Sequence, residues 1–353
     1  MECYSCYAIT RFDFAVNTRI DVSGEKCITM CCRNRIGEIP STDLTDNPRR
    51  NLEGFISMRH LAIVQGLAKN VKEQEFACKK CYLYMKKNWT FLTHINYVNL
   101  SVYPSPCQCR CFYCTVREFP YNHFDYFKKN SATLSKAYEN LFDTLKLAKK
   151  LNLTLPQQTT WQVSSGEITI HPYKKEILDL VRGEKSFLLT NAFIFDESIA
   201  RELHDNPLAF INLSIDCGTP ETWHKVKGVD NFYHVLDNLK AYRKASKRAG
   251  QIILKYIVLP GVNDSEEDFR AFVDIVNLLD VQLIEFSREV LEPRAVGPSN
   301  NKIWSFSNTV ESAARLLAIC KLNGTVPYRF LQYTDYEVSS MNFLADKLLE
   351  YMH

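Results

Sequence analysis

The spacing of hydrophobic residues changes near residue 94. Before that point, apolar residues recur at helical spacing over 55–69, which predicts an amphipathic helix, and 28–32 resembles a strand. After it, short apolar runs rich in strand-forming residues alternate with longer amphipathic stretches. The pattern predicts strands over 97–102, 159–163, 186–190, 210–216, 251–258 and 281–286, helices over 132–151, 173–182, 196–204, 220–248 and 265–278, and finally a helix near 309–322, a strand over 327–333 and a helix over 341–351.

Six βα-like units with strands that are apolar on both faces predict an α/β fold, with a parallel sheet covered by helices. No G-x-G-x-x-G sequence follows the first strand, so a partial or full barrel is favoured over an open dinucleotide-binding sheet. In either arrangement the ligand site is expected at the carboxyl ends of the strands. We therefore expect a Cys-rich module over 1–90, a core over 91–300 and a C-terminal extension over 301–353 that covers the barrel.

Composition narrows the function classes. The chain has 353 residues, of which 46% are hydrophobic, so it can bury a sizeable core. The formal net charge is +3 without a long Lys/Arg run, so we expect no nucleic-acid partner. The start lacks the pattern of a signal peptide, and no apolar stretch approaches the ~18 residues that span a bilayer, so the expectation is a cytoplasmic protein with no membrane partner.

Cysteine is unusually frequent and unevenly placed. Eleven of the 13 cysteines precede residue 115. Disulfides are rare in the cytosol, where a high cysteine count points to metal binding or catalysis. A purely structural use of cysteine as a small hydrophobe would scatter the residues along the chain.

The densest cluster follows the first strand of the alternating region. Cys107, Cys109, Cys111 and Cys114 lie within eight residues on a strand-to-helix loop. Three thiolates on a short loop can hold three irons of a [4Fe–4S] cube and leave the fourth iron open to a ligand. Soft thiolates are the ligands that iron–sulfur clusters prefer. The alternative is a buried cysteine cluster or a zinc knuckle, although zinc usually takes a second close C-x2-C pair, which is missing here.

The C-x3-C-x2-C spacing of Cys107, Cys111 and Cys114 resembles the signature of the radical S-adenosylmethionine (SAM) superfamily. Further residues in order strengthen the resemblance over about 95–290. It implies that the three cysteines hold the catalytic [4Fe–4S] cluster, with Cys109 as a non-ligand, and that the fold is a partial (β/α)6 barrel of the radical SAM type. Tyr113 stands at the family's aromatic position, which packs near the adenine of SAM.

The resemblance also assigns cofactor contacts at later strand ends. Ser165-Gly166-Glu167 looks like the family's GGE motif, with Ser in place of the first Gly, and its acid meets the methionine ammonium. Asn191 and Ser214 stand where the family contacts ribose or carboxylate, and Val258 begins the segment whose backbone meets adenine. The residues alone agree in part: each follows a strand, so the side chains converge on one mouth, and a carboxylate can accept hydrogen bonds from an ammonium. Taken singly, each also suits a turn, a cap or a solvated loop.

The family's chemistry is reductive. A one-electron reductant such as flavodoxin or ferredoxin supplies an electron, the C5′–S bond of SAM breaks, and a 5′-deoxyadenosyl radical abstracts hydrogen from the substrate. The resemblance implies a peptide, protein or carbohydrate substrate. The competing interpretation is a non-catalytic iron–sulfur or zinc redox or scaffold protein on the same fold.

The N-terminal cysteines form two C-x2-C pairs and a doublet. Part of this segment resembles the SPASM or twitch auxiliary-cluster modules of the superfamily, although those normally follow the barrel. The resemblance implies a second [4Fe–4S] cluster on Cys78, Cys81, Cys32 and Cys6, or Cys3 in place of Cys6. Zinc remains the alternative because two C-x2-C pairs also bind zinc, but the gap between them is far longer than in a zinc ribbon.

Two cysteines lie downstream. Cys217 follows a strand end and is a candidate catalytic residue, since a thiol there can return hydrogen to a substrate radical and give epimerisation. Packing as a small residue in a tight loop before Gly218 is the favoured explanation of this cysteine. Oxidation through the N-terminal cluster is therefore favoured over epimerisation. Cys320 lies in a predicted helix and is expected in the core.

Overall fold

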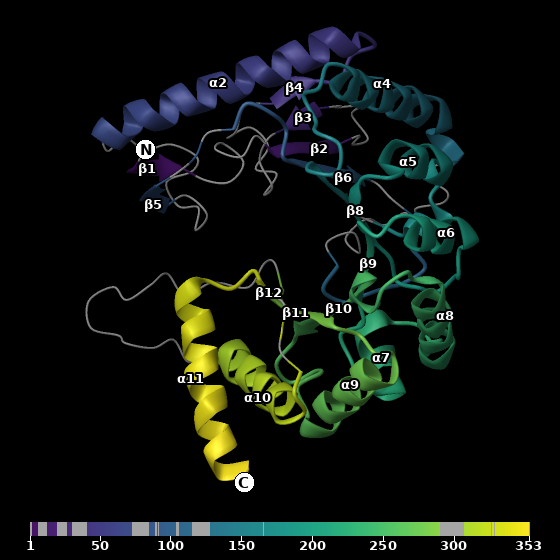
Figure 1. The fold of residues 1–353 in the computed structure, drawn as a ribbon, viewed down its shortest axis with the longest axis vertical. Helices are drawn as coiled ribbons and strands as arrows, with labels where there is room; N and C mark the ends of the chain where they lie inside the picture. The colour runs from purple at the N-terminus through teal and green to yellow at the C-terminus, as the bar shows by residue number, and fades with distance from the viewer. Residues whose placement is uncertain are drawn as a thin grey trace. The chain divides into compact units, whose positions relative to one another are not determined.

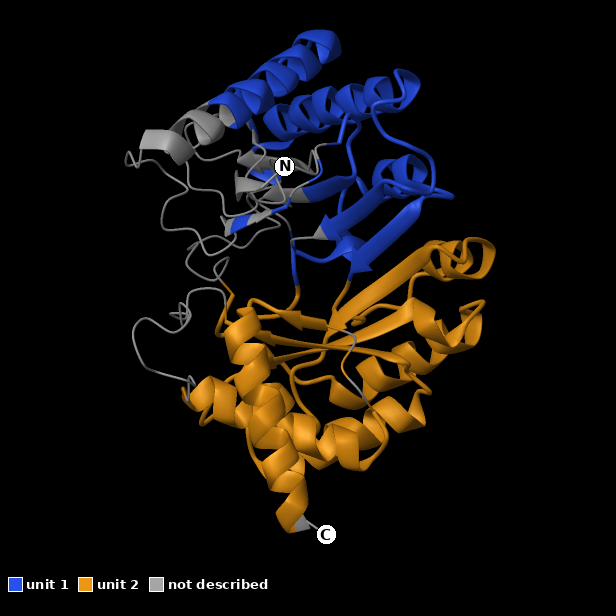
Figure 2. Cartoon of the chain, turned by 60° about the vertical axis from the view of Figure 1, so that its left-hand side comes forward, with its two compact units in different colours: residues 1–107, 121–189 blue, residues 108–120, 190–353 orange. Residues whose placement is uncertain are grey.

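The computed structural model describes residues 2–5, 13–19, 27–29, 41–72, 85–88, 90, 92–103, 106–114, 128–164, 166–289, 307–325, 327 and 329–352. The chain divides into two compact units (Figure 2). Unit 1 comprises 1–107 and 121–189, and unit 2 comprises 108–120 and 190–353. The cysteine loop is thus divided after Cys107, and each unit is considered by itself.

Unit 1 carries four parallel strands in the order β8-β7-β6-β2. Strands β2, β6 and β8 are labelled in Figure 1. These strands are β2 (Asp13–Arg19), β6 (Tyr97–Tyr103), β7 (Thr160–Ser164) and β8 (Lys185–Leu189). The helices are α2 (Pro48–Lys72), α4 (Ser131–Lys150) and α5 (Lys174–Val181), with the short turn η2 (Ile168–Ile170). The chain also forms two antiparallel pairs, β1 (Glu2–Ser5) with β5 (Met85–Asn88) and β3 (Cys27–Thr29) with β4 (Ser41–Asp43).

The segment before residue 90 contributes directly to this sheet. Strand β2 pairs with β6 in parallel over Asp13–Arg19, a strand that the sequence pattern did not indicate. Helix α2 packs along α4, where the buried Asn51 side chain donates to Thr144 Oγ1 at 2.9 Å. Asn51 also accepts from the backbone N–H of Thr45. This one side chain therefore fixes both the start of α2 and its packing against α4.

Unit 2 carries four further parallel strands, in the order β12-β11-β10-β9. Its strands are β9 (Ala209–Ser214), β10 (Ile252–Val258), β11 (Leu283–Arg288) and β12 (Arg329–Leu331). Its helices are α6 (Glu197–Asp205), α7 (Pro220–Lys227), α8 (Phe232–Ala245), α9 (Glu266–Leu278), α10 (Asn308–Leu322) and α11 (Asp335–Met352), with a short turn η3 (Ala249–Gln251). The core lies between this sheet and its helices, as the T-shaped contacts of Tyr256 on β10 with Phe269 and Phe272 of α9 illustrate.

Caps explain where the helices of unit 2 begin. Asp196, Thr219, Ser265 and Ser307 each accept a hydrogen bond from the first turn of the helix that follows, the usual arrangement for an N-cap. Helix α9 adds three acidic residues in its first turn, which the helix dipole favours. The alternation of strands and helices expected from the sequence is confirmed.

The predicted single helix over 220–248 is wrong. The chain instead forms α7 and α8, because Gly228 ends α7 in the left-handed conformation with φ of 67°. Asn231, with φ of 146°, then starts α8 in a new direction. The last helix also begins earlier than predicted, at Asp335.

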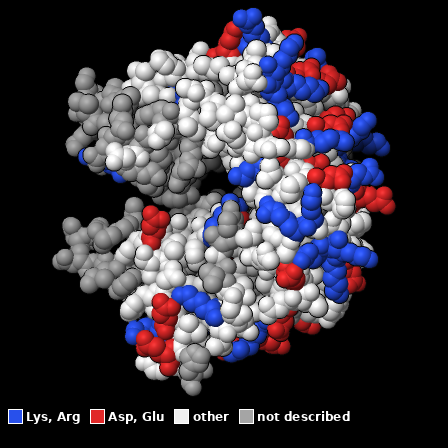
Figure 3. Space-filling view, in the orientation of Figure 1, with Lys and Arg blue, Asp and Glu red and all other residues white. Residues whose placement is uncertain are grey.

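Charges are mixed on the surface. On the face seen in Figure 3, Lys and Arg side chains are interspersed with Asp and Glu side chains over the described residues. Within the described residues, no helix is long and apolar enough to cross a membrane.

Candidate functional site

The cysteine loop of unit 2 is fastened to the end of α7. The backbone N–H of Arg110 donates to Lys227 O at 2.8 Å, and that of Phe112 donates to Val226 O at 3.2 Å. Gly228 follows directly, and a Cβ atom there would lie 3.0 Å from Arg110 O. A side chain at 228 would therefore press on the loop, in addition to the strain of its positive φ. These contacts fix the backbone from which Cys109, Cys111 and Cys114 project.

Three polar side chains that hydrogen-bond to one another connect the same loop to the end of β9. Tyr113 donates its hydroxyl to Asp216 Oδ2 at 2.5 Å, and Lys227 Nζ donates to Asp216 Oδ2 at 2.5 Å and to the Tyr113 hydroxyl at 3.0 Å. Lys227 also donates to Ser214 O at 2.6 Å. The side chains of Lys227 and Asp216 are 3% and 0% exposed, so this is a fully desolvated ion pair with its hydrogen-bonding capacity used.

The same groups shift one another's pKa values. Burial alone would lower the pKa of Lys227, but the Asp216 carboxylate holds it above the usual value. Burial, reinforced by Asp216, raises the pKa of the Tyr113 hydroxyl well above its usual value. A hydrogen bond from Cys109, supported by the Lys227 ammonium, lowers the pKa of the Cys111 thiol to about 6 against the opposing effect of burial. The loop therefore favours a thiolate at Cys111.

The ring of Tyr113 also packs against apolar side chains. Val226, Ile257 and Leu259 form a buried cluster, and Tyr113 packs against it. Val258 is itself buried at the end of β10. The structure thus brings together two elements that the sequence assigned to adenine binding, the aromatic residue of the cysteine loop and the end of the fifth predicted strand.

Asn191 reaches the loop from the end of β8. Its Nδ2 donates to Gln108 Oε1 at 3.1 Å and to Cys109 Sγ at 3.5 Å, while its Oδ1 accepts from Phe193 N at 3.0 Å. Ser214 is the last residue of the next strand, β9, and is partly exposed. Its carbonyl oxygen accepts a hydrogen bond from Lys227 Nζ. Asn191 and Ser214 therefore both connect to the framework of the loop in unit 2.

Gly166 and Glu167 lie in unit 1, close to where the loop begins. The backbone N–H of Glu167 donates to Pro106 O at 2.7 Å, one residue before Cys107. Gly166 has φ of 66°, which suits glycine at this sharp turn. The Glu167 side chain is fully buried and caps η2, accepting from Thr169 N at 3.0 Å and Thr169 Oγ1 at 2.8 Å.

Replacing Glu167 is expected to weaken SAM binding. Glu167→Ala removes a charge-assisted acceptor, so the loss should be about 2 kcal/mol, or roughly thirtyfold in affinity, measured by anaerobic calorimetry. Thr169→Val is the matched control, because it removes the hydroxyl donor to Glu167 but keeps the carboxylate. Iron content should be unchanged in both variants. Normal SAM affinity in Glu167→Ala would remove this residue from the cofactor site.

Cys217 is completely buried. Its exposed fraction is 0%, and burial raises the pKa of its thiol well above the usual value. The neighbouring Gly218 is packed so closely on α9 that a Cβ would lie 2.2 Å from Asp268 O. The hydrogen-donor role stays a prediction, beside a packing role that these contacts already account for.

The sequence analysis missed four residues that organise the site. Asp216 adopts φ of 56° after β9, and its Oδ1 accepts from Ile257 N. Asn263 donates to Asp216 O and Ile257 O, each at 2.8 Å. Asp268 accepts from the backbone N–H groups of Gly218 and Thr219. The fourth, Lys227, has no local signal, whereas Asp216 and Asn263 each lie two positions from a glycine, in IDCG and PGVND.

Four candidate ligands, Cys6, Cys32, Cys78 and Cys81, lie outside the described residues. Among the residues that are described, no three His, Cys, Asp or Glu side chains already form a metal site. The donor chemistry of the cysteine loop nevertheless fits an iron–sulfur cluster. Its thiols are partly exposed, its backbone is fastened, and Cys111 favours the thiolate that a cluster requires.

Comparison with known protein families gives a match that includes the cysteine loop. Residues 105–273 match the family model described as the Radical SAM superfamily. The chain carries a radical SAM domain. The predicted fold class, an α/β partial barrel of the radical SAM type, is confirmed. The radical SAM family implies a [4Fe–4S] cluster and SAM as cofactors.

The individual relatives are distant. The chain is 28% identical over 205 residues to a GTP 3′,8-cyclase of Acaryochloris marina, a match that covers 54% of this chain and 56% of the relative. It is 26% identical over 204 residues to a GTP 3′,8-cyclase of Microcystis aeruginosa, covering 55% and 57%. The chain thus spans little more than half the length of these relatives. Streptococcus suis SuiB bound to precursor peptide SuiA aligns with 99% of this chain and 75% of that chain, at 12% identity and a TM-score of 0.47.

Proposed function

We propose that the protein is an enzyme that cleaves SAM reductively and uses the resulting radical to abstract hydrogen from a substrate. The match over 105–273 carries this proposal, because it begins at the cysteine loop and extends from there through β7 and into α9. The bound cluster would supply one electron, delivered by a small reductant such as flavodoxin or ferredoxin, to break the C5′–S bond of SAM.

The residues of this chain would hold and orient the cofactors. Cys107, Cys111 and Cys114 would hold the cluster, and the Asp216–Lys227 pair would keep Tyr113 and the loop in place. Tyr113 and the end of β10 would contact adenine, while Glu167 would accept from the methionine ammonium. Asn191, Ser214 and Gly166 would complete the cofactor contacts. Such positioning, with water excluded, is the protein's part in cofactor-based radical chemistry.

The substrate class is the main change from the sequence-based expectation of a peptide, protein or carbohydrate. The similar proteins named GTP 3′,8-cyclase favour a nucleotide. Reduced protein should therefore be incubated anaerobically with SAM and either GTP or a panel of unmodified peptides and glycans. We expect GTP to accelerate 5′-deoxyadenosine formation and to be consumed. Consumption of a peptide or glycan instead would restore the earlier assignment, and no 5′-deoxyadenosine under any condition would favour a redox or scaffold protein.

An auxiliary cluster over 1–90 remains part of the proposal. Its ligands would be Cys78, Cys81, Cys32 and Cys6, and it would accept an electron and give an oxidised product, with epimerisation through Cys217 as the alternative outcome. Reconstituted protein is expected to hold about twice the iron of the triple variant Cys107→Ala/Cys111→Ala/Cys114→Ala, because each cube is held by its own thiolates. The remaining iron should disappear when Cys78 and Cys81 are also replaced. Zinc in the triple variant would contradict the auxiliary cluster.

A further inference from the structure

A polar row crosses the sheet of unit 2. Ser214 on β9 is paired in register with Lys255 on β10, Lys255 with Glu285 on β11, and Glu285 with Arg329 on β12. Residues paired in register across parallel strands point to the same face of the sheet. Asn212 precedes Ser214 by two positions on β9 and so shares this face.

The row faces away from the helices that cover the sheet. Tyr256, the next residue on β10, packs on Phe269 and Phe272 of α9, so Lys255 points to the opposite face. Phe286 and Phe330, in register with Tyr256, contact each other on the helix side. The polar row is therefore on the face of the strands opposite α9. Ser214, the last residue of β9, places one end of the row at the carboxyl edge of the strands, where α/β folds bind their ligands.

Most charges on and beside this face are already paired. The Glu285 carboxylate is fully buried, forms an ion pair with Arg329 and accepts from Asn212 Nδ2 at 2.8 Å. Asp216 is paired with Lys227. Lys255 is different, because no hydrogen bond or ion pair joins its ammonium to another described residue. Burial lowers the pKa of Lys255 despite the attraction of Asp216 and Glu285. By formal charge, Lys255, Glu285 and Arg329 together carry one positive charge in excess, and an anion beside Lys255 would offset the burial that lowers its pKa.

The side chain of Asn212 offers a hydrogen-bond acceptor to a ligand. Its amide nitrogen must face Glu285, because a carboxylate only accepts hydrogen bonds. Its Oδ1 is buried and has no hydrogen-bond partner within the part of the chain that the structure describes. A buried acceptor is rarely left without a donor in a native protein, so this atom points to a ligand with an N–H or O–H group.

We propose that Lys255, with the partly exposed Arg329 and Ser214 beside it, binds a phosphate group of the substrate, and that Asn212 accepts a hydrogen bond from the same molecule. This deepens the proposed function and rests on it for the identity of the reaction. An ammonium, a guanidinium and a hydroxyl are all donors, and they suit the several acceptor oxygens of phosphate. The Arg329 side chain is 37% exposed and can share such a ligand while it retains Glu285.

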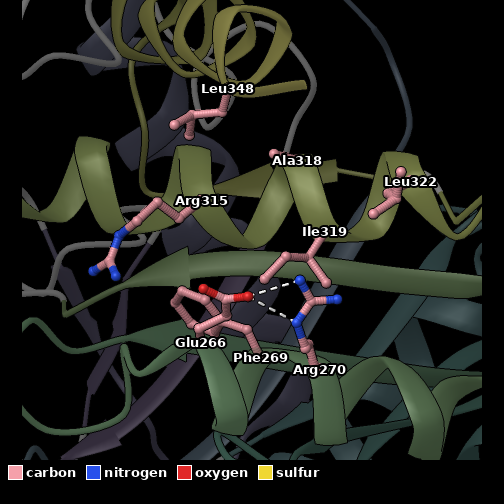
Figure 4. Close-up of a pocket in the computed structure, with 8 residues that line it drawn as sticks. All are labelled: Glu266, Phe269, Arg270, Arg315, Ala318, Ile319, Leu322 and Leu348. Atoms are coloured by element: carbon pink, nitrogen blue, oxygen red, sulfur yellow. Dashed lines mark hydrogen bonds and ion pairs between the residues drawn. The ribbon is translucent and has the colours of Figure 1, made fainter. Parts of the chain in front are cut away.

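Unit 2 also has a hollow that does not fit this role. It lies among α9, α10 and α11 and is lined largely by Phe269, Ala318, Ile319, Leu322 and Leu348 (Figure 4). Its cations are paired, since Arg270 binds Glu266 at 2.7 Å and Arg315 binds Asp264 at 3.0 Å. It lies on the helix side of the sheet and contains none of the candidate cofactor residues.

Direct binding of inorganic pyrophosphate tests the phosphate site without turnover. Anaerobic calorimetry on the reconstituted full chain should detect pyrophosphate binding, and Lys255→Met should weaken it by about tenfold to a hundredfold, the effect of losing one charged hydrogen bond. Lys255→Arg should retain most of the affinity. Lys240→Met is the matched control, because it removes an exposed lysine on α8 and should stay within twofold of wild type.

A second measurement needs no variant. Acetylation of Lys255 in the wild-type protein, quantified by mass spectrometry, should fall when pyrophosphate is present, while acetylation of Lys240 should not. Equal pyrophosphate affinity in wild type and Lys255→Met, or no protection of Lys255, would overturn the proposal. Loss of SAM affinity in Lys255→Met with unchanged pyrophosphate binding would also overturn it and assign Lys255 to the cofactor carboxylate. Pyrophosphate binding without SAM cleavage would contradict the proposed function and leave this site standing.

Discussion

Cys111→Ala is expected to abolish 5′-deoxyadenosine formation, with a loss of at least a thousandfold in the presence of excess reductant. Cys111 is one of three cysteines at the family spacing, and its thiolate is favoured by Cys109 and Lys227. A cluster that lacks one of its three protein ligands is expected to be lost or misplaced. The product should be quantified by liquid chromatography after anaerobic reconstitution, together with the iron content of each preparation.

Cys109→Ala is the control for this experiment. Cys109 is on the same loop and contacts both Cys111 and Asn191, so its replacement perturbs the surroundings but removes no predicted ligand. Most of the activity and the iron should remain. If Cys109→Ala is as inactive as Cys111→Ala, Cys109 is a ligand and the assignment by spacing is incorrect.

Lys227→Met should produce the largest loss of stability. The variant leaves Asp216 buried without its cation, and breaking a buried ion pair by removing one partner costs about 3–5 kcal/mol. Tyr113 and the backbone of Ile257 still donate to Asp216, so the lower end of that range is expected. The free energy of unfolding should be measured by anaerobic chemical denaturation, followed by far-ultraviolet circular dichroism.

Lys240→Met again provides the comparison. Its ion pair with Asp237 is exposed, so its loss should change the free energy of unfolding by no more than about 0.5 kcal/mol. The double variant Lys227→Met/Asp216→Asn should recover part of the stability, since it removes the uncompensated charge. A Lys227→Met protein as stable as Lys240→Met would show that the ion pair does not hold the cysteine loop in place.

Periodicity was sufficient to predict most of the core elements. The strands from β6 to β11 are short, rich in strand-forming residues and separated by amphipathic helices, and these features leave a local signal. The break between α7 and α8 has a weak local signal, because a single glycine such as Gly228 within a long helical pattern does not by itself predict the end of a helix. Strand β2 was missed because its partner β6 is far away in the sequence, and pairing over that distance has no local signature.

Some residues of the candidate site can likewise be predicted from the sequence, and others only from the structure. Cys107, Cys111 and Cys114 are close in sequence, so their spacing alone predicts a cluster. Lys227 lies 114 positions from Tyr113, and only the folded chain shows that the two share a hydrogen bond. Lys255 reads from the sequence as the one polar position in an apolar strand, and its excess charge becomes evident only when Glu285 and Arg329 are seen to pair with each other.

The most direct test of radical SAM chemistry in this protein is 5′-deoxyadenosine formation by the wild-type chain itself. Anaerobically reconstituted protein, reduced with dithionite and given SAM, should release 5′-deoxyadenosine and methionine in equal amounts, and neither should form without the reductant. Iron-loaded protein that binds SAM but releases no 5′-deoxyadenosine would contradict the account.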